Sequence, residues 1–297
     1  MIRSAVVLFS GGTDSTCAAA IVAEQVQRLH LLTFVEASTS KSPLPHENVR
    51  RLREAFPAVE IRHFVVSTDR LVRWLSYGDS IFDYVRRLFK EHIFNLVTPG
   101  FSSLSWHLAA LRYANLLRES KEENVIGVFD GMTQELTHLP GHMPIVRKQI
   151  EALYSESDLS FSSPVYEFPV PPDQKFVDRL VVDRHGFALS SDVVPGSRTT
   201  GKYLYERGIL PHPNVKGSMF DVQMQHDCYP FIVYNMLIFW FLMPVRSWSQ
   251  IEIDLAEVMA RRIKQARAIV GNWNDSRFET PTPLSTPGLT PQPTTKL

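Results

Sequence analysis

A run of small polar residues near the N-terminus, Ser10-Gly11-Gly12-Thr13-Asp14-Ser15, has the composition of a phosphate-binding loop. An apolar segment ends at Phe9 and an alanine-rich segment follows the run, so we expect a strand, a tight turn and a helix. Backbone N–H groups at the start of such a helix bind anions, and glycines let a phosphate approach closely. The spacing matches neither a Walker loop nor G-x-G-x-x-G. The residues predicted to bind ATP are Phe9, Ser10, Gly11, Gly12, Thr13, Asp14, Ser15 and Thr16.

Asp14 is the acidic residue of this loop, and a carboxylate repels phosphate unless a cation lies between them. We therefore predict that Asp14 either binds Mg²⁺ or braces the loop. The hydroxyl of Ser15 can add a hydrogen-bond donor to a phosphate, and Asp14 and Ser15 are predicted catalytic residues. The alternative interpretation is a glycine-containing turn between a strand and a helix, with no ligand.

A second polar group follows a later apolar segment that ends at Phe129. Its carboxylates and imidazoles could position Mg²⁺, deprotonate an incoming amine or read the edge of a nucleobase. Alternatively, Asp130-Gly131 forms only a turn and the histidines are exposed. Two basic residues further along the chain, Arg147 and Lys148, could bind a substrate carboxylate or pyrophosphate, or could lie on a solvated helix face. Asp130 and Lys148 complete the predicted catalytic set, and the predicted substrate-binding residues are Glu135, His138, His142 and Arg147.

The elements that position these residues alternate between short apolar runs and helical patterns, which is typical of β-α-β units around a parallel sheet. The first apolar run has no polar alternation, as expected of a central strand covered on both faces. We predict an α/β fold with a doubly wound, Rossmann-like parallel sheet, in which the loop after the first strand and the segment after Phe129 converge. The predicted strands are Ala5–Phe9, His30–Val35, Glu60–Val66 and Asn124–Phe129, and the predicted helices are Ser15–Gln27, Glu47–Phe56, Phe82–Phe94 and Ser103–Arg118.

The second half of the chain is less regular. We predict an ATP-binding α/β domain over residues 1–154 and an irregular, mainly helical region for substrate binding or oligomerisation over 155–275. Threonines and prolines dominate residues 276–297, which we predict to be disordered. The apolar run Phe231–Met243 is shorter than the roughly 20 residues of a membrane-spanning helix. We expect it to form a buried helix or a subunit contact, and a homodimer would suit the latter.

The amino-acid composition argues against several classes of protein. Lysine plus arginine and aspartate plus glutamate number 31 each, so no global positive field gathers nucleic acid. The two cysteines, Cys17 and Cys228, are too few for a tetrathiolate metal site and do not indicate a disulfide scaffold. Cys17 lies among alanines and is predicted to be a core residue. The N-terminal apolar run leads directly into the loop and does not resemble a signal peptide. We expect a cytoplasmic protein without a membrane partner.

The loop Ser10–Ser15 resembles the SGGxDS signature of the PP-loop ATP pyrophosphatases. This superfamily includes asparagine and NAD synthetases, tRNA thiolases, lysidine synthetase and 7-cyano-7-deazaguanine synthase. The resemblance implies an adenine nucleotide α-hydrolase-like fold and cleavage of ATP to AMP and pyrophosphate. It also implies that the loop amides hold the departing pyrophosphate while a substrate oxygen or sulfur attacks the α-phosphate, and that electrostatic stabilisation of the leaving group is the main catalytic effect.

Within this superfamily, residues 1 to about 150 are most similar to the 7-cyano-7-deazaguanine synthase (QueC-like) family. Two segments depart from its pattern, because they lack the arginine and asparagine of Val-Pro-Ala-Arg-Asn and the asparagine of Gly-Val-Asn. The family's four zinc cysteines are reduced to Cys228, within His226-Asp227-Cys228, so we predict no zinc site. The similar segments are Leu32-Thr33-Phe34, His46-Glu47, His63-Phe64-Val65-Val66, Thr98-Pro99-Gly100 and Gly127-Val128-Phe129-Asp130.

The resemblance implies an ATP- and Mg²⁺-dependent carbon–nitrogen ligase. It would adenylate a carboxylate of the deazapurine type, and an amine, ammonia or a protein would capture the acyl group. Relatives in bacterial antiviral operons make such an operon a plausible context. One alternative is a tRNA-modifying thiolase or lysidine-type enzyme, which the spacing of Gly127 and Glu135 resembles. Another is a nucleotide-binding subunit that has lost catalysis and serves an assembly through its apolar C-terminal region.

Overall fold

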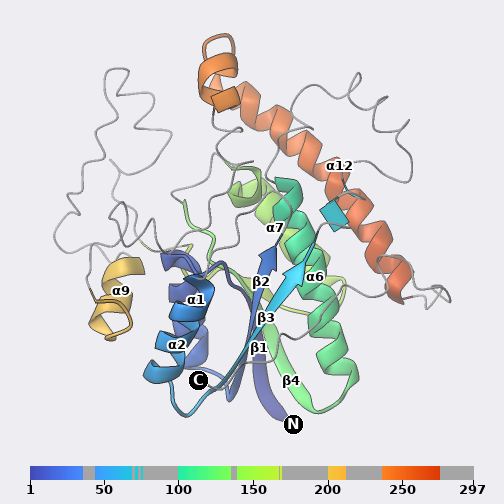
Figure 1. Cartoon of the computed structure of the whole chain (residues 1–297). Coiled ribbons are helices and arrows are strands. Elements are labelled where there is room, and N and C mark those ends of the chain that lie inside the picture. Colours follow the sequence, from blue (N-terminus) through green and yellow to red (C-terminus); the bar gives the residue numbers. More distant parts are fainter. Residues whose placement is uncertain are drawn as a thin grey trace.

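A five-stranded parallel sheet forms the centre of the protein (Figure 1). The computed structural model of the chain describes residues 1–35, 44–68, 71–72, 75, 100–134, 139–166, 168, 200–211 and 236–274. The strand order β3-β2-β1-β4-β5 reverses direction at β1, which places a topological switch point between β1 and β4. The strands are β1 (Ile2–Leu8), β2 (Arg28–Val35), β3 (Glu60–Ser67), β4 (Glu123–Phe129) and β5 (Phe161–Ser162).

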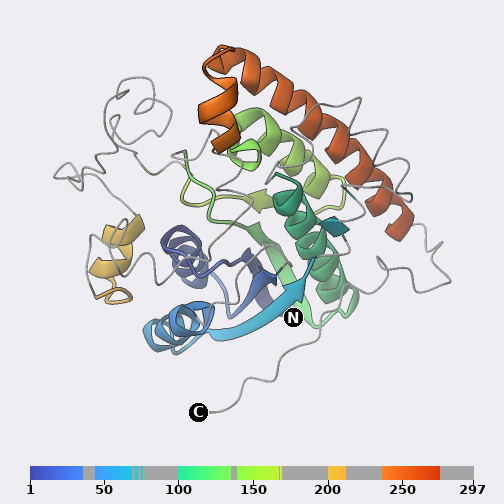
Figure 2. The ribbon, with the colours of Figure 1, turned by 45° about the horizontal axis from the view of Figure 1, so that its top comes forward.

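Helices cover both faces of the sheet, so the predicted doubly wound α/β fold is confirmed (Figure 2). Apolar residues of the central strand β1 face both sides of the sheet in alternation. Val6 and Leu8 point into one hydrophobic core, whereas Ala5, Val7 and Phe9 point into the other. One face is covered by α6 (Gly100–Glu119), α7 (Pro144–Ser155) and α12 (Trp248–Asn274), and the other by α1 (Thr13–Ala23), α2 (Leu44–Ala55) and α9 (Thr200–Glu206).

The four predicted strands are confirmed, and the helix boundaries differ by a few residues. The helix predicted to reach Gln27 ends at Ala23, because the chain then turns into β2 and the Gln27 N–H donates to the Arg3 carbonyl. The predicted helices over Glu47–Phe56 and Ser103–Arg118 correspond to α2 and α6. The predicted helix Phe82–Phe94 lies outside the described residues. A short helix, η2 (Pro140–His142), leads into α7.

The described part of the second half is mainly helical, as predicted. Its longest helix, α12, packs on α7 and α6 through Ile251, Leu255 and Met259. The strand β5 pairs with β4 and so belongs to the same sheet, although it lies beyond residue 154. The division of the chain at residue 154 stays a prediction, and the segment 276–297 lies outside the described residues.

The apolar run that ends at Met243 is only partly buried where it is described. Residues Leu237–Leu242 form a π-helix, η4, in which Ile238 is buried whereas Trp240 and Phe241 are each 63% exposed. The expectation of a buried helix is therefore wrong for this part, because only one side of η4 faces the core. The subunit contact stays a prediction. Among the described residues, no helix is long and apolar enough to cross a membrane.

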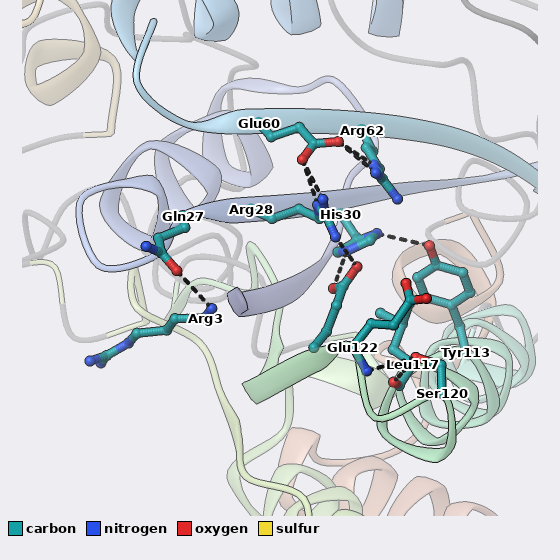
Figure 3. Close-up of polar contacts among 11 residues, drawn as sticks. Arg3, Gln27, Arg28, His30, Glu60, Arg62, Tyr113, Leu117, Ser120 and Glu122 are labelled. Carbon is teal, nitrogen blue, oxygen red and sulfur yellow. Dashed lines mark hydrogen bonds and ion pairs between the residues drawn. The ribbon is translucent and has the colours of Figure 1, made fainter. Parts of the chain in front are cut away.

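A buried polar cluster ties together the starts of the strands (Figure 3). Arg28 donates to Glu123 at 2.6 Å and to Glu60 at 2.7 Å. The His30 ring lies 2.7 Å from the Glu123 carboxylate through Nε2 and 2.8 Å from the Tyr113 hydroxyl through Nδ1. Burial lowers the pKa of His30, although the charge of Glu123 opposes this shift. The cluster joins β2, β3, β4 and α6 at the amino ends of the strands, opposite the Ser10–Ser15 loop. It therefore stabilises the sheet from which that loop extends.

Candidate active site

The loop between β1 and α1 has the backbone expected of a phosphate-binding turn. Gly11 has φ +85°, a left-handed conformation that favours glycine. A Cβ atom at Gly11 would also lie 3.1 Å from the Cα of Pro45, the second residue of α2. Gly12 is the N-cap residue of α1 and has an extended backbone. It has no side chain that could accept hydrogen bonds from the first N–H groups of the helix. The first turn of α1 therefore keeps the amide donors and the positive dipole end that attract an anion.

The hydroxyls of this loop form a closed ring of hydrogen bonds. Ser15 Oγ donates to the Gly12 carbonyl at 3.1 Å, so Ser10 Oγ is the donor in its 3.0 Å contact with Ser15 Oγ. The Gly12 N–H in turn donates to Ser10 Oγ at 3.3 Å. Asn48 Nδ2, on α2, donates to the Gly11 carbonyl at 2.6 Å. The ring and the α2 contact fix the turn in one shape before any ligand arrives.

Asp14 lies in the first turn of α1, next to the loop amides. Its Oδ1 accepts a 2.6 Å hydrogen bond from the hydroxyl of Thr200, the first residue of α9. A residue of the second half of the chain thus holds the acidic residue of the loop. Both predicted roles of Asp14, Mg²⁺ ligand and brace of the loop, stay predictions, and Oδ1 can accept further bonds beside that from Thr200.

The segment after β4 packs directly against the loop, which confirms the predicted convergence. A Cβ atom built on Gly131 would lie 2.5 Å from the backbone N of Ser15 and 2.8 Å from the carbonyl carbon of Asp14. Only a glycine permits so close an approach of two backbones. The side chain of Asp130 supports this turn, because its Oδ1 accepts the Met132 N–H at 3.1 Å.

Asp130 itself is buried, with 3% of its surface exposed. Burial raises the pKa of Asp130 to about 6, against the lowering effect of its hydrogen bonds and of the Arg147 charge. Its second oxygen, Oδ2, faces His107 Nε2 on α6 at 3.9 Å. The carboxyl therefore lies behind the turn and does not open directly onto the surface of the loop. Its predicted catalytic role stays a prediction.

The remaining described candidates lie near η2 and α7. His142 Nδ1 is 3.2 Å from the Thr133 carbonyl, and burial lowers the pKa of His142 to about 4. The Arg147 guanidinium stacks on the Tyr166 ring at 3.6 Å. Arg147 is largely buried and close enough to lower the pKa of Asp130, whereas Lys148, the next residue, is exposed. The structure thus brings Arg147 close to Asp130, places His142 close enough to Asp14 for that charge to act on its pKa, and leaves Lys148 exposed on α7.

Several predicted residues fall outside the described part of the chain: Glu135, His138, Thr98, Pro99, His226, Asp227 and Cys228. The predicted absence of a zinc site therefore stays a prediction. Cys17 is fully buried in the core beneath α1, as predicted. Among the residues that the structure does describe, no group of three or more histidines, cysteines or acids could hold a metal ion. A single carboxylate, Asp14, fits Mg²⁺ that arrives with phosphate oxygens, because Mg²⁺ commonly takes only one or two protein carboxylates.

A second chain of hydrogen bonds joins β2 and β3 to Phe9, and sequence reasoning assigned its residues no role in the site. Thr33 Oγ1 donates to the Phe9 carbonyl at 2.7 Å, so His63 Nε2, 2.8 Å away, must donate to Thr33. Burial and the neighbouring His46 lower the pKa of His63 to about 4, so the ring is neutral. Polar residues among the apolar residues of two strands, Thr33 in β2 and His63 in β3, are a signal that could have indicated them.

Comparisons with known proteins agree with this geometry over the first part of the chain. Residues 4–84 match the family described as Queuosine biosynthesis protein QueC. Among solved structures, the chain is similar to a predicted subunit of tRNA methyltransferase from Methanocaldococcus jannaschii, with 18% identity over 56% of this chain and 71% of that chain and a TM-score of 0.35. It is also similar to NMN synthetase from Francisella tularensis, with 12% identity over 90% of this chain and 87% of that chain and a TM-score of 0.38. No curated protein sequence matches the chain.

The family match spans the Ser10–Ser15 loop, Leu32-Thr33-Phe34 and β3, on which the sequence resemblance rests. This part of the chain is therefore similar to the QueC family. The matched segment ends at residue 84, before β4, the Asp130 turn, α7 and α9. The roles of residues in those elements rest on the geometry described above.

Proposed function

We propose that this chain, which is QueC-like over residues 4–84, is an ATP-dependent ligase that activates a carboxylate as an adenylate. An amine or ammonia would then capture the acyl group. The observation that carries the proposal is the preformed loop from Ser10 to Ser15, with Gly11 at φ +85° and uncapped amides at the start of α1. Such a loop suits the pyrophosphate part of ATP, whose charge grows as it leaves.

In the first step, a carboxylate oxygen of the acid attacks the α-phosphorus of ATP. The bond between that phosphorus and the bridging oxygen breaks, and pyrophosphate leaves with the bonding electrons. The N–H groups at the start of α1 would stabilise this charge, whereas the Ser10 hydroxyl donates its hydrogen to Ser15 Oγ and contributes by holding the turn. The hydroxyl ring between Ser10 and Ser15 keeps these donors in place, so little reorganisation is needed during the step.

Asp14 would hold Mg²⁺ together with the phosphate oxygens, and the bound ion would neutralise part of the polyphosphate charge. Thr200 keeps the Asp14 carboxylate in one orientation through the 2.6 Å hydrogen bond. Ser15 contributes through the ring described above. Asp14 and Ser15, two of the four predicted catalytic residues, would thus serve the activating half-reaction, with Thr200 in support.

In the second step, the nitrogen lone pair attacks the acyl carbon, the bond to the AMP oxygen breaks, and the nitrogen loses a proton. The buried guanidinium of Arg147, fixed on Tyr166, is the cation best placed to attract an acidic substrate toward the Asp130 turn. A deazapurine-type acid is the substrate that the QueC-like segment favours. The roles of Lys148, Glu135 and His138, a protein acceptor, a homodimer, a cytoplasmic location and an antiviral operon stay predictions.

The test is release of labelled AMP from α-labelled ATP, with Mg²⁺, 7-carboxy-7-deazaguanine and ammonia, together with the mass of the acid product. Asp14→Ala should abolish release, whereas Glu54→Gln, which removes an exposed carboxylate on α2, should not change it. Release with tRNA alone would favour the tRNA-modifying alternative. No AMP with any acid or with tRNA would refute both enzymes and favour a nucleotide-binding subunit.

A further inference from the structure

Two buried polar atoms behind the phosphate loop face each other without forming a hydrogen bond. They are Asp130 Oδ2, at the end of β4, and His107 Nε2, on α6, which lie 3.9 Å apart. The two side chains are 5% and 0% exposed, and by distance and angle neither atom has a hydrogen-bond partner within the described part of the chain, although the Ser163 hydroxyl lies close enough to Asp130 to lower its pKa. An unpartnered buried polar atom is costly, so a pair of them facing each other indicates a specific arrangement of protons.

The neighbour of His107 on α7 decides which ring nitrogen carries hydrogen. The Tyr154 hydroxyl donates to the backbone carbonyl of His107 at 3.1 Å. A hydroxyl has one hydrogen, so in the 3.2 Å contact between His107 Nδ1 and the Tyr154 oxygen the ring must be the donor. With hydrogen on Nδ1, a neutral imidazole presents a lone pair at Nε2. That lone pair points at Asp130 Oδ2.

Two lone pairs at this separation repel each other unless a proton lies between them. We propose that His107 is a positioning residue that shares one proton with Asp130, held on the Asp130 carboxyl and directed at His107 Nε2. The pair is then neutral: Nδ1 donates to Tyr154, Oδ1 accepts from Met132, and the proton on Oδ2 faces Nε2 across 3.9 Å.

The surroundings favour the uncharged form of each partner. Burial lowers the pKa of His107 to about 3, and His142 adds to this effect. Burial raises the pKa of Asp130 to about 6 and keeps that of Tyr154 well above its usual value. The other charged groups that act on Asp130 come from α7, where Arg147 lowers its pKa and Glu151 raises it. The edge of the His107 ring otherwise meets Phe161 of β5, which carries no charge.

The pair matters for the loop because the same turn touches Ser15. The Asp130 side chain holds Met132, and Gly131 between them packs on the backbone of Ser15. His107 therefore acts on the phosphate loop through Asp130. The proton placement rests on the geometry alone, and only its consequence for ATP cleavage rests on the proposed function.

The test is nuclear magnetic resonance of the full chain with ¹⁵N-labelled histidine and ¹³C-labelled aspartate. At pH 5, where an exposed histidine is charged, His107 should be neutral with hydrogen on Nδ1. Its signal is identified by its loss in His107→Gln or, if that variant does not fold, by its shift in Tyr154→Phe. The Asp130 carboxyl, identified through Asp130→Asn, should titrate near pH 6 in the wild type.

His107→Gln should lower the midpoint of Asp130 by about one pH unit or more, because an amide N–H donates to the ionised carboxylate whereas the imidazole lone pair favours the acid. His63→Gln, the same change at a buried histidine bonded to Thr33, should leave that midpoint unmoved. A charged His107 at pH 5, hydrogen on Nε2 at that pH, or an Asp130 midpoint that His107→Gln does not lower would overturn the inference. These readouts need no enzyme activity, so they fail independently of the AMP assay.

Discussion

The contact between Gly131 and Ser15 gives the sharpest prediction about the loop. In Gly131→Ala, the new Cβ would lie 2.5 Å from the Ser15 N and 2.6 Å from its Cα. Both atoms are backbone, so no rotamer change relieves the overlap. Since Cβ atoms essentially never approach other atoms within 3.0 Å, the turn and the start of α1 must separate by at least about 0.5 Å.

The size of the effect follows from this displacement. Overpacking of this kind costs about 1–3 kcal/mol of unfolding free energy. A misplacement of about 1 Å in a catalytic constellation costs on the order of 100-fold in rate, so we expect kcat/KM for ATP cleavage to fall about 10- to 100-fold. Urea unfolding measures the first quantity and release of labelled AMP the second.

Gly208→Ala is the matched control. Gly208 has φ +70°, but no atom lies within 4 Å of the position that a Cβ would occupy there, so the change strains the backbone without intruding on a neighbour. It should cost about 1–2 kcal/mol of stability and leave ATP cleavage unchanged. If Gly131→Ala cleaved ATP as fast as Gly208→Ala, the loop would not depend on the Asp130 turn and the reasoning would be refuted.

Three further changes test other contacts. Burial raises the folded-state pKa of Asp130 to about 6 from its usual 3.8, so this group lowers the unfolding free energy of the wild type by about 3 kcal/mol as the pH rises from about 3 to about 7. Asp130→Asn should lack this loss, and equal pH dependence of the two proteins in urea unfolding would contradict it. Thr200→Val removes the hydroxyl that donates to Asp14 and should raise the Mg²⁺ concentration for half-maximal AMP release up to about tenfold. Thr200→Ser, which keeps a hydroxyl, should have the wild-type value. Identical values for the wild type and both variants would show that Thr200 does not hold Asp14. Glu123→Ala leaves Arg28 and His30 without their shared acceptor and should lower the unfolding free energy by about 3–5 kcal/mol, so a loss below about 1 kcal/mol would show that the cluster does not hold the strands.

The sequence was sufficient for the elements whose pattern is local. The Ser10–Ser15 loop and four strands could be predicted because apolar runs, glycines and a following helix lie next to one another in the chain. The two-residue strand β5 is too short to show any period, and it forms only because β4 offers an edge to pair with. The uniformly apolar η4 run gave no sign that Trp240 would face outward.

In the site, too, contacts between residues far apart in the sequence could not be predicted. The contact of Asp14 with Thr200 joins residues 186 positions apart, and no spacing rule reaches that far. His107 is different, because it lies three residues after Leu104 and four before Leu111, on the buried face of α6. Its helical spacing could therefore have indicated a buried imidazole, whereas its partner Asp130 required the fold.

The hydrogen bond between Thr200 and Asp14 also affects the order in which the site forms while the ribosome synthesises the chain. The loop leaves the ribosome before the residue that holds its carboxylate, which is made 186 positions later. At about 5–20 residues per second, the nascent loop waits roughly 10–40 s for that partner. Through this interval the chain carries the binding turn without its brace, and a product truncated before α9 would keep the loop but never acquire the contact that orients Asp14.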